Sequence, residues 1–300
     1  MPLISIIINC FNGEIFLRKA IESVYEQDFV NWEIIFWDNA STDASALIAN
    51  SFDKKLKYFS SKKTIPLGKA RNMALQEAKG KYIAFLDCDD VFLPGKLTKQ
   101  ISQMEGDDFA LSYSGATIVD EFDKKIRIFK VKNTSGYIFG NLLRHYEIIM
   151  ASVMINRKIL EKEKYEFAED LKYCPDYNLF MKIASHYPVC VINESLVNYR
   201  KMNDSLSTQS IDIASTEIRY TLDYIFSASP HLKNRFQLEA TMAYDKLYYY
   251  DAVANIYKKN KVSARRIINK IIFKRWQYFV LYVLLFLPIP IKVLLKILRR

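Results

Sequence analysis

Apolar runs and helical spacing alternate along the first hundred residues. The apolar runs have the length of buried strands and lie at residues 3–9, 32–37, 56–59 and 81–86. Segments with helical spacing or a cap of Ser, Thr and Asp separate them, at residues 15–24, 41–48 and 69–79. Strands that alternate with helices are typical of a βα repeat around a parallel sheet.

After Pro94 the alternation weakens. Residues 109–119 and 126–131 read as strands of a mixed sheet, while residues 152–155 and 189–192 are expected as edge strands. Residues 176–185 have helical spacing, and from about residue 212 the pattern is mostly helical. The expected fold class is therefore α/β, with a mixed, mainly parallel sheet, flanking helices and a C-terminal helical region.

The chain has 300 residues, of which 50% are hydrophobic and 8 are glycine, which excludes a disordered or fibrous protein. Its net charge of +10 comes from one end. Between residues 252 and 300 there are 12 Lys or Arg and no Asp or Glu, so the rest of the chain is nearly neutral. A basic end on a neutral body predicts an anionic surface as its partner.

The 4 cysteines show no CxxC spacing, which argues against a zinc site and favours a reducing compartment. The first apolar run follows Met1 and Pro2 without a charged leader, so we expect no signal peptide. The cytoplasm, or a surface facing it, is the expected place of action.

An acidic turn, Asp87-Cys88-Asp89-Asp90, directly follows the strand at residues 81–86. Carboxylates this close repel one another unless a cation joins them, and their oxygen atoms suit Mg²⁺ or Mn²⁺. A solvated acidic turn is the alternative that the segment alone leaves open. The chain has neither GxGxxG nor GxxxxGK[ST], so a bound phosphate would need a metal ion to neutralise it.

Three other polar segments should meet the acidic turn, because ligands of parallel sheets gather beyond the carboxyl ends of the strands. They are Cys10-Phe11-Asn12, Asp38-Asn39 and Gly68-Lys69-Ala70-Arg71-Asn72. Carboxylates, an arginine and an aromatic ring together suit a base, a ribose and a diphosphate. Gly68, which lacks a Cβ, is expected to let the backbone approach this ligand.

In these segments the chain resembles the family 2 inverting glycosyltransferases, which have a GT-A (Rossmann-like) fold. The matching pieces are Ile4-Ser5-Ile6-Ile7-Ile8-Asn9-Cys10-Phe11-Asn12, Trp37-Asp38-Asn39-Ala40-Ser41-Thr42-Asp43, Gly68-Lys69-Ala70-Arg71-Asn72 and the DxD-like Phe85-Leu86-Asp87-Cys88-Asp89-Asp90 with Pro94. Four motifs in this order are much more specific than a lone DxD. The resemblance is strong over residues 2–100 and patchy over residues 150–207.

The resemblance implies a role for each residue of the site. Phe11 would lie against the nucleotide base, and Asp38 and Arg71 would hydrogen-bond it. Asp87 would contact the ribose, and Asp89 would be the chief ligand of Mn²⁺ or Mg²⁺ on the diphosphate.

Simpler roles stay open for three residues. Asp38 and Asp43 are also placed to cap the helix that follows, and Arg71 to form a surface salt bridge.

The family places a general base in a Glu-Asp pair that opens a helix on the acceptor side. Cys174-Pro175-Asp176-Tyr177 resembles that element, with Pro175 where glutamate often stands, so Asp176 is the predicted base. The competing pair is Glu169-Asp170. A carboxylate that only stabilises the first helical turn is the simpler role of Asp176.

The chain departs from the family at Met202, where a histidine often completes the metal shell. Methionine is a poor ligand for a hard cation. Asp89, the diphosphate and water are then expected to hold the metal, or Asn203 contributes a ligand. His145 and His186 match no family motif and are interpreted as surface or packing residues.

Residues 278–291 are uncharged, and Lys and Arg flank them. This stretch is shorter than the ~20 residues of a membrane-spanning helix. We expect it to lie in an anionic membrane surface, with Trp276, Tyr278 and Tyr282 at the level of the headgroups. A helix buried against the body is the alternative, and the many aliphatic residues disfavour nucleic acid.

The expected function is metal-dependent transfer of a hexosyl or N-acetylhexosaminyl group from a nucleotide sugar, with UDP as the first candidate, to a saccharide acceptor on a lipid carrier. Surface polysaccharide or lipo-oligosaccharide synthesis at the cytoplasmic face of the inner membrane would suit a peripheral enzyme of this kind. A membrane-tethered nucleotide-sugar-binding protein with a degenerate transferase domain is one alternative. A sugar nucleotidyltransferase is another, although its glycine-rich phosphate loop is missing.

The expected organisation has three parts. A GT-A domain covers residues 1–207, with a nucleotide-binding half at 1–100 and an acceptor half at 101–207. A helical extension follows at residues 208–270, and a basic amphipathic tail at 271–300.

Overall fold

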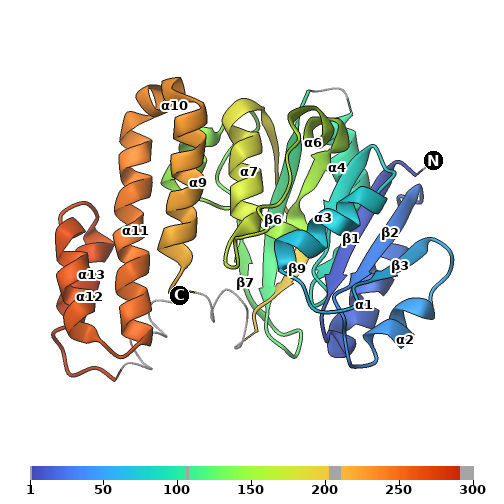
Figure 1. The fold of residues 1–300 in the computed structure, drawn as a ribbon, viewed down its shortest axis with the longest axis horizontal. Helices are drawn as coiled ribbons and strands as arrows, with labels where there is room; N and C mark the ends of the chain where they lie inside the picture. Colours follow the sequence, from blue (N-terminus) through green and yellow to red (C-terminus); the bar gives the residue numbers. More distant parts are fainter. Residues whose placement is uncertain (1, 106–107, 203–210, 291–300) are drawn as a thin grey trace. The chain divides into compact units, whose positions relative to one another are not determined.

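The computed structural model describes residues 2–105, 108–202 and 211–290 (Figure 1). It divides into two compact units, one made of Met1–Leu142 and Tyr146–Asn203 and the other of Leu143–His145 and Asp204–Arg300. The division expected at residues 207 and 270 stays a prediction.

In the described residues of the first unit, nine strands form one mixed sheet in the order β3-β2-β1-β4-β8-β6-β9-β5, with β7 paired to β6. The strands are β1 Ile4–Cys10, β2 Trp32–Asp38, β3 Leu56–Ser60, β4 Tyr82–Phe85, β5 Val91–Phe92, β6 Leu111–Val119, β7 Lys125–Phe129, β8 Met154–Asn156 and β9 Val189–Arg200. Strands β1 to β4 pair in parallel, and β8 pairs antiparallel with β4 and β6. The expected α/β class with a mixed sheet is confirmed.

The expectation of edge strands after residue 150 was wrong. Strand β8 lies between β4 and β6, and β9 pairs with both β6 and β5. An apolar run shows that a strand is buried, but its neighbours depend on pairing between residues far apart in the chain.

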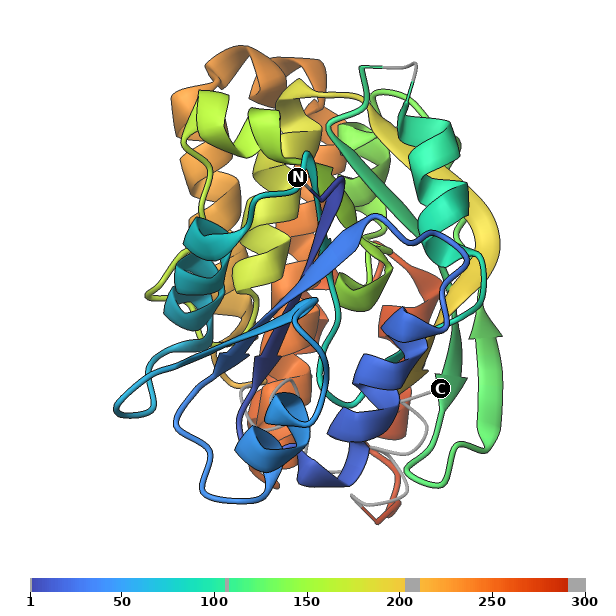
Figure 2. The same cartoon turned by 90° about the vertical axis from the view of Figure 1, so that its right-hand side faces the viewer.

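Helices cover both faces of this sheet. They are α1 Glu14–Tyr25, α2 Ser45–Asn50, α3 Leu67–Glu77, α4 Lys96–Met104, α5 Phe139–Arg144, α6 Arg157–Glu163 and α7 Pro175–His186, with a 3₁₀ turn at Met150–Ser152. Figure 2 shows α1 and α3 on opposite sides of the strands. Helix α7 lies on the same face as α3, where Phe85 of β4 packs against the ring of Phe180.

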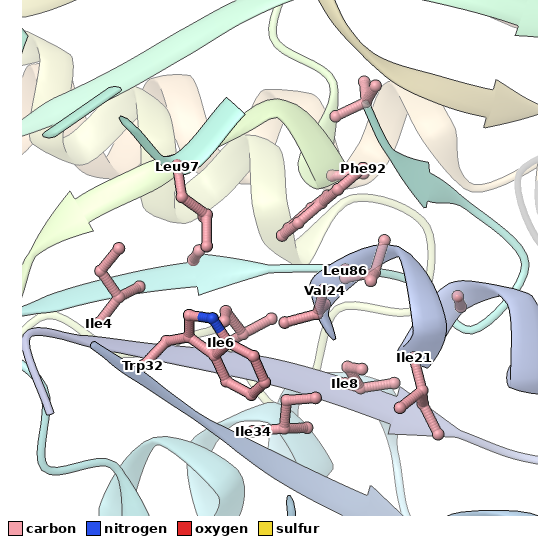
Figure 3. Packing of buried hydrophobic residues seen from close by; sticks show 14 of the residues in the cluster. Ile4, Ile6, Ile8, Ile21, Val24, Trp32, Ile34, Leu86, Phe92 and Leu97 are labelled. Carbon is pink, nitrogen blue, oxygen red and sulfur yellow. The ribbon is translucent and has the colours of Figure 1, made fainter. Parts of the chain in front are cut away.

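The core under α1 follows from the alternation of side chains along β1. Ile4, Ile6 and Ile8 point to the same face and pack with Ile21 and Val24 of α1 (Figure 3). Ile15, which belongs to the helical spacing seen in the sequence, is instead 81% exposed. The apolar face of α1 runs through Leu17, Ile21 and Val24.

The second unit is helical and has a small core of its own. Its helices are α9 Ala214–Ala228, α10 Pro230–Arg235, α11 Gln237–Tyr257, α12 Lys261–Ile268 and α13 Trp276–Leu284, with a 3₁₀ turn at Asn269–Ile271. Tyr278 and Leu281 of α13 pack against Ile256 and Ile268. Within residues 211–290 and the rest of the described chain, every helix is too short or too polar to cross a membrane.

Candidate functional site

The predicted site segments leave the sheet at one edge. Cys10 ends β1 and pairs with Asp38, the last residue of β2. Ile7 pairs with Phe85, the last residue of β4, and the acidic turn begins two residues later. Because these strands are parallel, the segments that follow them all emerge on the carboxyl side of the sheet.

Helix α3 brings Arg71 to the acidic turn. Its Nη2 lies 3.1 Å from Oδ1 of Asp87, and its guanidinium lies over the ring of Phe167 at 5.4 Å. Arg71 is only 5% exposed, so this ion pair is not the surface salt bridge considered above. A buried ion pair restricts both partners, and the Arg71 side chain therefore orients Asp87.

Asp89 has the least satisfied carboxylate of the turn. Within the described residues it forms no hydrogen bond or ion pair through its side chain. Burial and the negative charge of Asp87 raise the pKa of Asp89 to about 6. A cation at this carboxylate would offset that repulsion, so the donor set fits a hard divalent metal.

Asp90 plays a different part from its neighbours. Its Oδ1 accepts a hydrogen bond from the backbone N–H of Arg200 at 2.8 Å, and its Oδ2 is buried without a partner. Burial, followed by the charges of Asp89 and Asp87, raises the pKa of Asp90 well above its usual range. This residue joins the turn to strand β9.

Arg200, the last residue of β9, contacts the backbone of the acidic turn. Its Nε donates to the carbonyl oxygen of Asp89 at 2.9 Å, and its Nη2 lies 2.7 Å from Oδ1 of Asp123. Its Nη1 donates to the carbonyl of Asp120 at 3.0 Å, and its guanidinium lies 4.3 Å over the ring of Phe16. The side chain of Arg200 is buried, so these contacts set the position of the turn.

Asp38 and Phe11 differ in how open they are to a ligand. Phe11 is 50% exposed just beyond β1. Asp38 is buried, and its two oxygens accept from the N–H of Ser41 at 2.7 Å and from the hydroxyl of Tyr58 at 2.8 Å. Asp38 therefore closes the turn after β2 but does not cap the helix that follows, because the N-cap residue of α2 is Ala44.

Asp43 also has a structural role. Its carboxylate accepts from the N–H of Glu14 at 2.9 Å and from the N–H of Ser45 at 3.0 Å. It thus joins the first turns of α1 and α2. Burial raises the pKa of Asp43, but the hydrogen bonds from Ser45 and Glu14 together outweigh it, so the pKa is lowered.

Asp176 lies in the first turn of α7, directly after Pro175. Burial raises the pKa of Asp176, while the positive charge of Arg71 opposes that shift and the charge of Asp87 adds to it. Asp176 therefore shares one electrostatic environment with Arg71 and Asp87. The competing Glu169 is exposed and lies 3.7 Å from Lys69.

Two tyrosines of the site were not predicted from the sequence. The hydroxyl of Tyr58 contacts Asp38, and Tyr199 on β9 lies close enough to the acidic turn and Asp176 for their charges to act on it. Burial and the charges of Asp90, Asp87, Asp89 and Asp176 raise the pKa of Tyr199. The only available signal was the position of Tyr199 and Arg200 in the segment that resembled the family.

In the parts of the chain that the structure describes, no three His, Cys, Asp or Glu side chains form a ready-made metal cage. Met202 is partly buried, and Asn203, the other ligand considered, lies outside the described residues. Completion of the metal shell by the diphosphate and water, or by Asn203, stays a prediction.

Comparison with known proteins decides the family. Residues 5–162 match the family described as Glycosyl transferase family 2. The chain is 30% identical over 268 residues to an uncharacterised glycosyltransferase of Methanocaldococcus jannaschii, an alignment that covers 85% of this chain and 88% of the relative. This chain belongs to glycosyl transferase family 2.

Two further proteins add detail. An Escherichia coli protein, UDP-Glc:alpha-D-GlcNAc-diphosphoundecaprenol beta-1,3-glucosyltransferase, is 28% identical over 209 residues, covering 69% of this chain and 80% of the relative. The structure of a Pyrobaculum calidifontis mannosyltransferase with GDP-Man and Mn²⁺ superposes with a TM-score of 0.59 at 16% identity, covering 95% of this chain and 84% of that one.

These likenesses confirm the GT-A fold and the transferase class. Some relatives are longer proteins, and the chain spans 29% of one from Rickettsia bellii.

Proposed function

We propose that this glycosyltransferase moves a sugar from a UDP-sugar, with inversion at the anomeric carbon, to a saccharide acceptor carried on a lipid. The observation that carries the proposal is the shared environment of Arg71, Asp87 and Asp176 beside the open carboxylate of Asp89. This arrangement supports a donor site at Asp87 and Asp89 and a general base at Asp176 close enough for their charges to interact. Synthesis of a surface polysaccharide or lipo-oligosaccharide is the pathway class that fits this chemistry.

The donor site is proposed at the carboxyl edge of β1, β2 and β4. The exposed ring of Phe11 supports stacking on the base. Asp38 is proposed to accept from the base through the remaining lone pairs of oxygens that already bond Ser41 and Tyr58. Asp87, oriented by Arg71, is proposed to accept hydrogen bonds from the ribose. Arg71 is then a positioning residue in addition to a partner of the base.

Asp89 is proposed as the metal ligand, holding Mn²⁺ or Mg²⁺ on the diphosphate. The mannosyltransferase with Mn²⁺ supports the use of a divalent metal in this fold. The ion, when bound, neutralises the charge of the departing nucleoside diphosphate. The raised pKa of Asp89 supports this assignment, because a bound cation would offset both of its causes, burial and the negative charge of Asp87.

Asp176 is proposed as the general base that takes the proton from the acceptor hydroxyl as its oxygen attacks the anomeric carbon. A raised carboxyl pKa makes a stronger base, and burial provides that shift. Because the base must be ionised, the rate should fall as the pH drops through this raised pKa. The first-turn position of Asp176 alone would predict no such effect on turnover.

The name of the Escherichia coli relative supports a lipid-linked acceptor. The second unit gives a separate reason: Phe273, Trp276 and Phe279 are exposed, and so are Arg266 and Lys270. Exposed aromatic and basic residues suit an anionic membrane surface, and we propose peripheral attachment at the cytoplasmic face.

Two alternatives make different predictions. A degenerate domain, which the Met202 and Pro175 departures leave open, would bind UDP and Mn²⁺ without turnover. A sugar nucleotidyltransferase would make a nucleotide sugar from a nucleoside triphosphate and a sugar phosphate.

The test is a panel of nucleotide sugars incubated with the full chain and Mn²⁺, with slow donor hydrolysis as the readout. We expect hydrolysis of a UDP-sugar. Asp89→Ala should abolish it and weaken metal-dependent UDP binding, whereas Asp176→Asn should lower turnover about 100-fold and leave UDP binding intact. Glu169→Gln is the matched control and should keep the wild-type rate.

The proposal is wrong if Asp89→Ala transfers sugar at the wild-type rate. Equal loss of UDP binding and turnover in Asp176→Asn would remove the base assignment.

A further inference from the structure

Two cysteines lie side by side at the acidic turn. Cys10 ends β1, and Cys88 lies three residues beyond β4. These strands pair in parallel through Ile7 and Phe85, each three residues before its cysteine. Both cysteines therefore follow the last paired position of β1 and β4 by the same number of residues.

The sulfur atoms point to the same place. A Cβ added to Gly13 would lie 2.7 Å from Sγ of Cys10 and 2.9 Å from Sγ of Cys88. Gly13 therefore leaves room for both sulfurs, and this room is bounded by the first turn of α1.

We propose that Cys10 and Cys88 are a modification site, at which oxidation by a peroxide forms a reversible disulfide that inhibits the enzyme. This role does not require either cysteine to bind a metal or a substrate. The inhibition rests on the proposed transferase function, whereas formation of the disulfide does not.

The oxidation balances with hydrogen peroxide as the oxidant. The sulfur of one thiolate attacks a peroxide oxygen, the O–O bond breaks, and the departing hydroxide takes up a proton as water. The other sulfur then attacks the resulting sulfenic acid, the S–O bond breaks, and a second water leaves. Two thiols lose two electrons, and one hydrogen peroxide becomes two waters.

The disulfide would change the acidic turn because Cys88 lies between Asp87 and Asp89. A disulfide brings its sulfurs to about 2.05 Å, closer than two thiols in contact. Cys10 is held in a strand and donates to Oγ of Ser45 at 3.4 Å, so the turn is the part that moves. Displacement of Asp87 and Asp89 would disturb nucleotide binding.

Cys174 and Cys190 provide internal controls. Both are buried, Cys174 directly before α7 and Cys190 within β9. Neither is adjacent in the sheet to β1 or β4.

The test treats the reduced full chain with increasing hydrogen peroxide and blocks remaining thiols with iodoacetamide. Peptide mapping without reduction should find Cys10 linked to Cys88. Donor hydrolysis should fall about 100-fold and return with dithiothreitol. Cys10→Ser and Cys88→Ser should each keep their own untreated rate in peroxide, while Cys190→Ser stays sensitive.

Two results would contradict the proposal, one for the site and one for the inhibition. Absence of the linked peptide at full oxidation overturns the site, and a linked enzyme with unchanged turnover overturns the inhibition. If Cys88→Ser does not fold, Cys10→Ala carries the same comparison. If no donor is hydrolysed even by the reduced protein, the proposed function fails, while the linked peptide and UDP binding still decide the cysteine proposal.

Discussion

Arg200 connects three segments that are distant in the sequence. Its side chain contacts the acidic turn, the β6–β7 turn at residues 120–123 and the ring of Phe16 in α1. Desolvating a guanidinium is costly, and only a full set of acceptors offsets the cost. Because Arg200 is buried and its Nε donates to the carbonyl oxygen of Asp89, strand β9 fixes the position of the acidic turn.

We predict that Arg200→Lys weakens Mn²⁺-dependent UDP binding about tenfold and lowers the free energy of unfolding by about 3 kcal/mol, because an ammonium cannot replace the guanidinium fork. Calorimetric titration and urea unfolding measure the two effects. Lys19→Met is the control, since Lys19 lies 2.8 Å from Asp123 and does not contact the acidic turn. Equal loss of UDP binding in both variants would contradict this role.

Lys96 is buried, and none of the described residues supplies it with a counter-ion. Its Nζ contacts Oε1 of Gln100 at 2.5 Å and lies 4.1 Å from the Phe92 ring centroid. These neutral partners do not offset the loss of water, and burial lowers the pKa of Lys96 to about 7. In the unfolded chain the ammonium keeps its ordinary pKa of about 10.4.

Between pH 7 and 10 the unfolded chain therefore binds more protons at Lys96, and this residue makes stability rise with pH by about 1.4 kcal/mol per unit. Below pH 7 Lys96 is protonated in both the folded and the unfolded chain, and the full cost of burying its charge lowers the free energy of unfolding. We predict that the difference in unfolding free energy between Lys96→Met and the wild type shrinks with this slope from pH 7 to 9. Lys99→Met, at an exposed position, should show no slope, and parallel curves for Lys96→Met would contradict the assignment.

At the scale of elements, α3 and the segment at residues 167–169 are in close contact. The side-chain amide of Asn72 donates to the carbonyl of Phe167 at 2.9 Å and accepts from its N–H at 2.9 Å. A Cβ on Gly68 would lie 2.6 Å from the carbonyl oxygen of Ala168. The expectation that Gly68 admits a ligand to the backbone was wrong, because this close neighbour is the chain itself.

We predict that Gly68→Ala lowers the free energy of unfolding by about 2 kcal/mol and weakens UDP binding, because it pushes α3 and its Arg71 from the loop. Urea unfolding and UDP titration measure both. Glu77→Ala, at an exposed position of the same helix, should change neither by a similar amount. Unchanged UDP binding in Gly68→Ala would show that α3 does not position Arg71.

At the scale of the whole molecule, helix α13 is partly buried, and the membrane role of the C-terminal residues stays a proposal. Tyr278 stacks on Tyr249 at 5.7 Å and is buried, so it was wrongly assigned to the headgroups. Trp276, Phe279 and Val283 of the same helix are exposed. Helix α13 therefore packs one face on the core of the second unit and leaves an apolar face open. Residues 291–300, with four of the predicted cations, lie outside the described residues.

We predict that Trp276→Ser with Phe279→Ser reduces binding to vesicles that contain phosphatidylglycerol about 100-fold, because each aromatic ring contributes about 1.5–3 kcal/mol on burial. Vesicle sedimentation measures this effect. Tyr220→Ser, at an exposed position of α9, is the control and should bind as the wild type does. Equal binding by the double variant would remove the membrane role of this face.

The sequence by itself determined the alternation of β1 to β4 with α1 to α3, because strand and helix periods are local properties. It also placed Asp38 and the acidic turn at strand ends and Arg71 between the third and fourth strands, since their order follows from the chain. The tertiary structure decided what these residues contact. Three such contacts join residues far apart in the chain. They are the positions of β8 and β9 inside the sheet, the contacts of Arg200 and the burial of Tyr278. Local patterns carry no information on such partners, because they are selected by packing and desolvation over the whole fold.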